Sequence, residues 1–333
     1  MTTQPTTATA APDLDLAIEV SGLTKRFGER TVIDNVALQV PRGSTFGYLG
    51  LNGAGKTTLI RVLLGLTPAT SGTMSLLGLP VPSRRAEALA KVGAIVDEPR
   101  FHGYLTGREN LSILAAAREP AAHARIPSSL QRVGLADRAD DAVARYSMGM
   151  RQRLGVAACL LGDPELMILD EPMNGLDPAG MLEFRRMIGT FVDEGRTVVL
   201  SSHLLDEVEK TCDAVAIVDG GRVVSQGPIA SVISGAPVLR IGCGDPDTAV
   251  AIAWSLSAVS TVDSSADGVV VHMRREIDGR SVAGELNRRL VESDIDVYSL
   301  ELTRPTLEDR FLEITSTLGA RPITDTPHLG ADR

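Results

Sequence analysis

A glycine-rich segment between Gly50 and Thr57 has the residue types and spacing to bind phosphate. It reads Gly-Leu-Asn-Gly-Ala-Gly-Lys-Thr and fits the pattern G-x-x-x-x-G-K-[ST]. Glycines let backbone N–H groups approach phosphate oxygens, and the positive end of a following helix adds to the attraction. Lys56 is one of only four lysines in the chain, and its charge suits the β- and γ-phosphates of a nucleoside triphosphate. The residues expected to bind the nucleotide here are Asn52, Gly53, Ala54, Gly55, Lys56, Thr57 and Thr58.

Two adjacent carboxylates, Asp170 and Glu171, follow an apolar run at 166–169 that is typical of a buried strand. Asp170 is suited, together with the Thr57 hydroxyl, to holding Mg²⁺ and its hydration shell. Glu171 is suited to polarising the water that attacks the γ-phosphate. An acidic pair after a strand is by itself most often a solvated turn. Because a phosphate-binding loop precedes this acidic pair in the sequence, a catalytic role for the pair is favoured.

Two further motifs narrow the class of nucleotide-binding protein. Residues 146–153 read Tyr-Ser-Met-Gly-Met-Arg-Gln-Arg and resemble the L-S-G-G-Q-x-Q-R signature of ABC ATPases, although Met148 and Met150 depart from it. The resemblance implies that Ser147 and Gly149 contact the γ-phosphate held by an opposite subunit; a simple helix cap is the alternative. His203 ends the next predicted strand after Glu171, where the family has its switch histidine. We therefore expect His203 to be catalytic.

The resemblance to ABC ATPases spans residues 17–235 and carries expectations for the whole assembly. It implies the α/β fold of a P-loop NTPase with a helical subdomain, ATP and Mg²⁺ as ligands, and a head-to-tail pair of ATPase subunits, either a homodimer or two different paired subunits. Phe27 matches the aromatic residue that stacks on adenine, with an ordinary half-buried strand aromatic as the alternative. Residues 174–177 match the D-loop, which touches the other subunit in this family.

Residues 170–180 and 304–309 look like the corresponding strings of ABC-2 exporters for drugs, bacteriocins and lantibiotics. In those systems the permease is a separate six-helix chain, which implies a peripheral position at the cytoplasmic face of the cell membrane. An ABC ATPase acting on ribosomes or DNA, and an importer motor, are the alternatives. A net charge of −9 disfavours a nucleic-acid partner, which needs a basic face. No apolar run approaches the roughly 18 residues that would span a bilayer.

Asp97 is the sharpest departure from the family pattern. Residues 92–99 align with the Q-loop, where the family normally has a glutamine near Mg²⁺ and the permease interface. An ionised acid close to a phosphate would be repelled unless the metal compensates its charge. We expect Asp97 to face Mg²⁺ in the closed state and to retreat when nucleotide leaves, with a solvated loop acid as the alternative.

The elements that must position these residues follow from the apolar pattern. Alternation predicts two antiparallel strands at 17–27 and 31–40. Residues 105–160 are expected to be mostly helical. Further predicted strands alternate with helices, which indicates a mainly parallel sheet covered on both faces. These strands lie at 44–49, 92–96, 166–169, 197–201 and 214–219.

The chain is expected to contain two domains between disordered ends. Residues 1–15 are a predicted disordered leader, and 319–333 a predicted disordered tail. The ATPase domain is predicted over 16–235, with its helical subdomain at about 100–160. Residues 236–318 are predicted to form a small α+β accessory domain, because their elements follow the βαββαβ order of a ferredoxin-like unit.

Overall fold

A computed structural model describes residues 15–318, except 234, 236, 266–267, 275–276 and 304–305. The predicted leader, apart from its last residue, and the predicted tail lie outside the described residues. The chain divides into two compact units, Met1–Pro228 and Ile229–Arg333. This division precedes the boundary expected at residue 235, because helix α9 (Ile229–Val232) packs on α12 (Leu307–Leu318) of the second unit.

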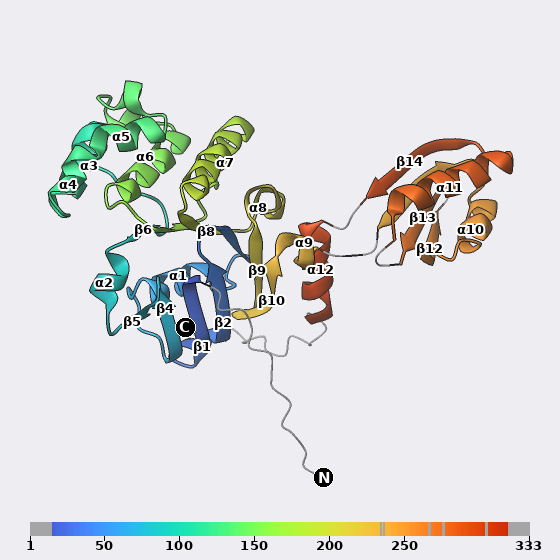
Figure 1. Ribbon diagram of the computed structural model, residues 1–333, viewed down its shortest axis with the longest axis horizontal. Coiled ribbons are helices and arrows are strands. Elements are labelled where there is room, and N and C mark those ends of the chain that lie inside the picture. The colour runs from blue at the N-terminus through green and yellow to red at the C-terminus, as the bar shows by residue number, and fades with distance from the viewer. Residues whose placement is uncertain are drawn as a thin grey trace, which may run out of the picture. The chain divides into compact units, whose positions relative to one another are not determined.

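A six-stranded sheet in the order β10-β9-β3-β8-β7-β6 forms the centre of the first unit (Figure 1). All neighbouring pairs are parallel except β9 and β10. Every residue of β3, β7 and β8 is buried, as expected for a parallel sheet covered on both faces. The strand bounds are β3 Thr45–Leu49, β6 Val92–Ile95, β7 Leu166–Asp170, β8 Thr197–Ser202, β9 Ala214–Asp219 and β10 Arg222–Pro228.

A second, antiparallel sheet carries the first strands of the chain in the order β2-β1-β4-β5. Its bounds are β1 Leu16–Phe27, β2 Arg30–Pro41, β4 Ser71–Leu76 and β5 Leu79–Val81. Helix α1 (Lys56–Leu63) contacts β2 and β4 of this sheet and β7 of the parallel sheet, so it lies between the two. The β1–β2 pairing is as predicted, whereas β5 and the separation of these strands into their own sheet were not.

The remaining helices of the first unit cover the parallel sheet and build the helical subdomain. Helices α7 (Pro178–Asp193) and α8 (Leu205–Thr211) contact β3, and α7 also contacts β8. Helix α2 (Arg85–Leu89) contacts β6. The subdomain comprises α3 Gly107–Ala116, α4 Ala121–Ala124, α5 Ile126–Arg132, the short 3₁₀ turns Ala136–Arg138 and Val143–Arg145, and α6 Met148–Leu160.

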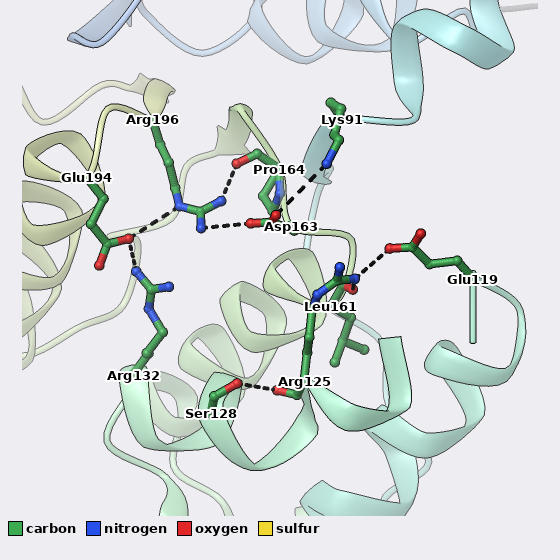
Figure 2. A network of polar contacts seen from close by, with 10 residues as sticks. All are labelled: Lys91, Glu119, Arg125, Ser128, Arg132, Leu161, Asp163, Pro164, Glu194 and Arg196. Atoms are coloured by element: carbon green, nitrogen blue, oxygen red, sulfur yellow. Dashed lines mark hydrogen bonds and ion pairs between the residues drawn. The ribbon is translucent and has the colours of Figure 1, made fainter. Parts of the chain in front are cut away.

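Ion pairs join this helical subdomain to the amino-terminal edge of the parallel sheet (Figure 2). Arg132 of α5 pairs with Glu194, which also lies 3.4 Å from Arg196. Arg196 in turn pairs with Asp163 at 2.9 Å. The subdomain is therefore held to the sheet by charge as well as by apolar packing.

The second unit contains the predicted ferredoxin-like arrangement. Its antiparallel sheet has the order β12-β13-β11-β14, which is the order that the βαββαβ connection produces. Leu239, Ile241, Val271, Leu286 and Leu290 lie in its core. The elements are β11 Val238–Cys243, α10 Pro246–Trp254, β12 Val259–Ser265, β13 Gly268–Met273, α11 Gly279–Glu292 and β14 Val297–Thr303.

Candidate active site

The phosphate-binding loop leaves the carboxyl end of β3 and runs directly into α1. Gly55 precedes the helix with φ of 96°, a left-handed conformation that favours glycine. A Cβ atom at Gly55 would also lie 2.8 Å from the Val32 carbonyl oxygen. No side chain caps this helix end, so its first N–H groups are available to an anion.

Lys56 reaches back over the loop that precedes it. Its side chain is 6% exposed, and its ammonium donates to the Gly50 carbonyl at 2.7 Å. The same nitrogen lies 3.1 Å from Oε1 of Glu171. The structure thus brings the predicted phosphate-binding lysine to the predicted catalytic acid, although 115 positions separate them in sequence (171 − 56).

The acidic pair and the histidine meet because β7 and β8 are neighbours in register, with Asp170 opposite Ser201. The Ser201 hydroxyl donates to Asp170 and accepts a hydrogen bond from the Glu171 backbone N–H at 3.0 Å. Glu171 itself has φ of 46°, which turns its side chain away from the strand direction. Its Oε2 lies 2.9 Å from Nδ1 of His203. Oε1 of Glu171 is buried, with the Lys56 ammonium at 3.1 Å as its polar neighbour.

A hollow of about 340 Å³ lies over the phosphate-binding loop. Glu171 lines it, together with two residues of β2, Arg30 and Val32, that the sequence analysis did not single out. The sequence could have indicated these two residues only through the register of the β1–β2 hairpin, because Arg30 pairs with the predicted site residue Phe27. Ala54 does not line the hollow and packs into the core instead. The loop residues that line it are Asn52, Gly53, Gly55, Lys56, Thr57 and Thr58.

Phe27 and Asp97 are among the predicted site residues that do not line this hollow. Phe27, at the end of β1, is 52% exposed and contacts Lys25. Asp97 follows β6 with φ of 59°, and its 56% exposed carboxylate pairs with Arg61 of α1 at 2.5 Å. It lines a different hollow of about 420 Å³, beside Phe101 and Leu114 of the helical region. The structure therefore does not bring Asp97 to Lys56 and Glu171, and its role at Mg²⁺ stays a prediction.

The signature residues occupy a third position in the first unit. Ser147 caps α6 by accepting a hydrogen bond from the Met150 N–H at 3.2 Å. A Cβ atom at Gly149 would lie 3.2 Å from Leu176, so only a small residue fits easily between α6 and the D-loop. Ser147 and Gly149 line a hollow of about 440 Å³ with D-loop residues, separate from the one over Lys56. Within one chain, the signature residues and the phosphate-binding loop therefore line two separate hollows.

Comparison with known proteins identifies the family. The family model described as ABC transporter matches residues 33–174. An uncharacterised ABC transporter ATP-binding protein of Bacillus subtilis, YdbJ, is 37% identical over 90% of this chain and 95% of its own length. The chain belongs to the ABC transporter ATP-binding proteins.

Other relatives and solved structures agree with this membership. The bacitracin transport ATP-binding protein BcrA of Bacillus licheniformis is 36% identical, covering 89% of this chain and 96% of its own. A solved ATP-binding subunit of an ABC transporter is 30% identical, with a TM-score of 0.58 over 65% of this chain and 91% of that one. A dimeric cassette in a post-hydrolysis state with ADP and Pi shares the fold at 20% identity and a TM-score of 0.57, covering 63% and 98%.

In this ABC ATPase, the cluster at the carboxyl end of the sheet contains the residues predicted to take part in ATP hydrolysis. Glu171, the predicted base, lies between Lys56, the predicted phosphate-binding residue, and His203. His203 has its Nδ1 on Glu171, which fixes the orientation of both side chains. The Lys56 ammonium, 3.1 Å from Oε1 of Glu171, keeps that carboxylate beside the phosphate-binding loop, where a hydrolytic base is needed.

The oxygen groups beside the loop fit a magnesium ion that is bound together with phosphates. Within the described ranges, no three His, Cys, Asp or Glu side chains gather in a group that could hold a metal. Magnesium does not need such a cage, because it usually takes one or two protein oxygens and completes its shell with phosphate and water. Thr57 lines the hollow, and Asp170 is buried with one oxygen held by Ser201. Bound there, the ion would neutralise developing phosphate charge.

Proposed function

We propose that this ATPase powers export of a peptide, drug or other small molecule through a separate membrane permease of the ABC-2 type. The supporting observation is likeness over nearly the whole chain, including the second unit, to the bacitracin transport protein BcrA. A lantibiotic transport protein of Streptococcus pyogenes, SrtF, is 38% identical over 62% of this chain and 89% of its own. No described helix combines the length and apolar character needed to cross a bilayer.

Coupling to the permease would use the hollow beside the helical subdomain. That hollow contains Asp97, whose carboxylate is paired with Arg61 on the same helix that begins at Lys56. A permease segment that displaced Asp97 would therefore act on the helix that holds the phosphates. Tyr104, Ile113 and Leu114 are exposed large apolar residues of the same region, which suits a protein contact at the cytoplasmic face of the membrane.

Two copies of the chain would be required for hydrolysis. The half-site containing Lys56 and the half-site containing Ser147 and Gly149 are separate hollows of one chain. Head-to-tail pairing would place each against its complement, giving two composite sites with ATP and Mg²⁺ between the copies. The net charge of −9 disfavours nucleic acid as a partner.

The test is co-expression with the six-span membrane protein expected to be encoded beside this gene. We expect a stable complex whose ATPase turnover exceeds that of the isolated chain, and cells that gain resistance to bacitracin-class peptides. The complex with Lys56→Ala should assemble but neither turn over ATP nor protect cells. Association with ribosomes in place of a membrane protein, or dependence on a periplasmic-type binding protein, would contradict export.

A further inference from the structure

A buried lysine lies beside the exposed aromatic ring of β1. The ammonium of Lys25 is 4.6 Å from the centroid of Phe27, within the range of a cation–π contact. The two residues are two positions apart on one strand, so they share a face of the sheet. Lys25 is 8% exposed, whereas Phe27 is 52% exposed. The ring is therefore supported by a buried cation while much of its surface stays open.

The loop that follows the phosphate-binding helix holds Lys25 in place. Its ammonium donates to the Pro68 carbonyl at 2.8 Å. Thr70, in the same loop, donates its N–H to the Thr24 carbonyl at 2.8 Å and accepts from the Arg26 N–H at 2.9 Å. No carboxylate of the described chain lies within ion-pair distance of Lys25. A buried cation without a counter-ion is costly, so its contact with the ring carries more weight than at an exposed site.

The ring belongs to the β1–β2 hairpin, whose second strand lines the hollow over the phosphate-binding loop. Phe27 pairs directly with Arg30 across the hairpin, and residues so paired project to the same face. Arg30 lines that hollow together with Asn52 and Lys56. Helix α1 therefore begins at the phosphate-binding Lys56, and the loop that follows the helix holds Lys25 beside the aromatic ring.

We propose that Lys25 is a positioning residue for the nucleobase of ATP. Its ammonium covers one face of the Phe27 ring, fixes the ring's rotamer and withdraws π-electron density, so that the exposed face stacks better on adenine. Fixing the ring before binding lowers the entropy lost on complex formation. This inference rests on the proposed contact between Phe27 and the base.

The test compares the dissociation constants of ATP and of inorganic tripolyphosphate, which lacks the base. Lys25→Met keeps the apolar stem and should weaken ATP binding about three- to tenfold while leaving tripolyphosphate binding unchanged. Lys25→Arg, which retains a cation for the ring, should stay close to the parent protein. Phe27→Ala should lose the same base-dependent affinity, and Lys25→Met should add little in that background.

The outcomes distinguish a failure of the Lys25 proposal from a failure of the proposed contact between Phe27 and adenine. If Phe27→Ala weakens the binding of ATP but not of tripolyphosphate, and Lys25→Met weakens neither, the proposal for Lys25 is overturned and the contact between Phe27 and adenine stands. If Phe27→Ala leaves the ratio of the two affinities unchanged, the base contact itself is wrong. Equal weakening of both ligands by Lys25→Met would make Lys25 merely structural. Lys25→Gln retains a donor for Pro68 without the charge, and it replaces Lys25→Met if that variant does not fold.

Discussion

The charged residues at the two ends of the parallel sheet are arranged differently. At the carboxyl ends of β3, β7 and β8 stand the loop of Lys56, the pair Asp170–Glu171, and His203. At the amino ends of β6, β7 and β8 stand Lys91, Asp163 and Arg196 (Figure 2). Strands β7 and β8 therefore carry predicted catalytic groups at one end and members of an ion-pair network at the other.

The amino-end network pairs its charges with one another. Asp163 has Arg196 at 2.9 Å and Lys91 at 3.9 Å, and Arg196 also donates to the Pro164 carbonyl. Arg125 joins Glu119 at 2.6 Å and the Leu161 carbonyl at 3.0 Å. The hydrogen bond from Arg196 lowers the pKa of Asp163 below its ordinary value. These charges have partners already, which suits them to stability.

The charged groups at the carboxyl end line a hollow. The Lys56 ammonium contacts the Gly50 carbonyl and Oε1 of Glu171, and both residues line the hollow over the phosphate-binding loop. A phosphate can replace such contacts at little cost, whereas it would have to break paired arginines at the other end. The difference lies in access: Lys56 and Glu171 line a hollow that a ligand can enter, whereas Asp163 and Arg196 are bonded to each other and to their neighbours.

The largest effect is expected from Glu171→Gln, which removes the base and keeps the shape. ATP turnover should fall about 10²–10⁴-fold while ATP remains bound, because only water activation is lost. The matched control is Glu165→Gln at the other end of β7, where Glu165 pairs with Arg42. Steady-state turnover and retained nucleotide would be measured for both variants. Turnover above a tenth of the parent in Glu171→Gln would sink the assignment of the base.

A mixture of two inactive chains tests the separate half-sites. Ser147→Arg spoils the signature and Lys56→Ala spoils the phosphate-binding loop, so each chain alone should be nearly inactive. In a mixed pair one composite site contains neither change, and turnover should rise well above the sum of the separate chains. Mixed dimers that are folded, verified by mass, and still inactive would count against the head-to-tail arrangement.

The smallest effect is expected from Asp163→Asn in the ion-pair network. At pH 7 the free energy of unfolding should fall by about 0.5–1 kcal/mol, since these are half-exposed pairs that solvent screens. Because the pKa of Asp163 is lower in the folded than in the unfolded protein, its carboxylate stabilises the fold at pH values above the unfolded pKa. That stabilisation is lost as the pH falls through the folded pKa. The difference between the two proteins should therefore shrink below about pH 4. Urea unfolding at pH 7 and pH 3 measures it; a difference that grows in acid would contradict the network's role.

Local patterns predicted most of the reactive end. The loop at Gly50–Thr57, the acids after β7 and His203 after β8 each follow a strand, and the parallel sheet brings such strand ends together. The ferredoxin-like order was also readable, because it depends on the succession of neighbouring elements. These features need no knowledge of contacts between distant segments.

Contacts between distant segments explain what the sequence could not predict. Arg30 and Val32 reach the hollow only through the β1–β2 register. The pairing of Asp97 with Arg61 depends on how β6 lies against α1, and nothing in residues 92–99 names that partner. Several ion pairs at the amino end join residues that are more than 30 positions apart, such as Arg196 with Asp163. Charged residues of this kind look like an ordinary solvated surface until the fold pairs them.

The most direct test of the account compares two lysines, one at each end of the sheet. Equilibrium binding of MgATP would be measured for Lys56→Ala and for Lys91→Ala, with folding checked by circular dichroism. We predict that Lys56→Ala weakens binding about 30-fold or more, because a buried charge contact to phosphate is lost. Lys91→Ala should bind ATP like the parent protein. The account would be contradicted if Lys56→Ala bound ATP within about threefold of the parent.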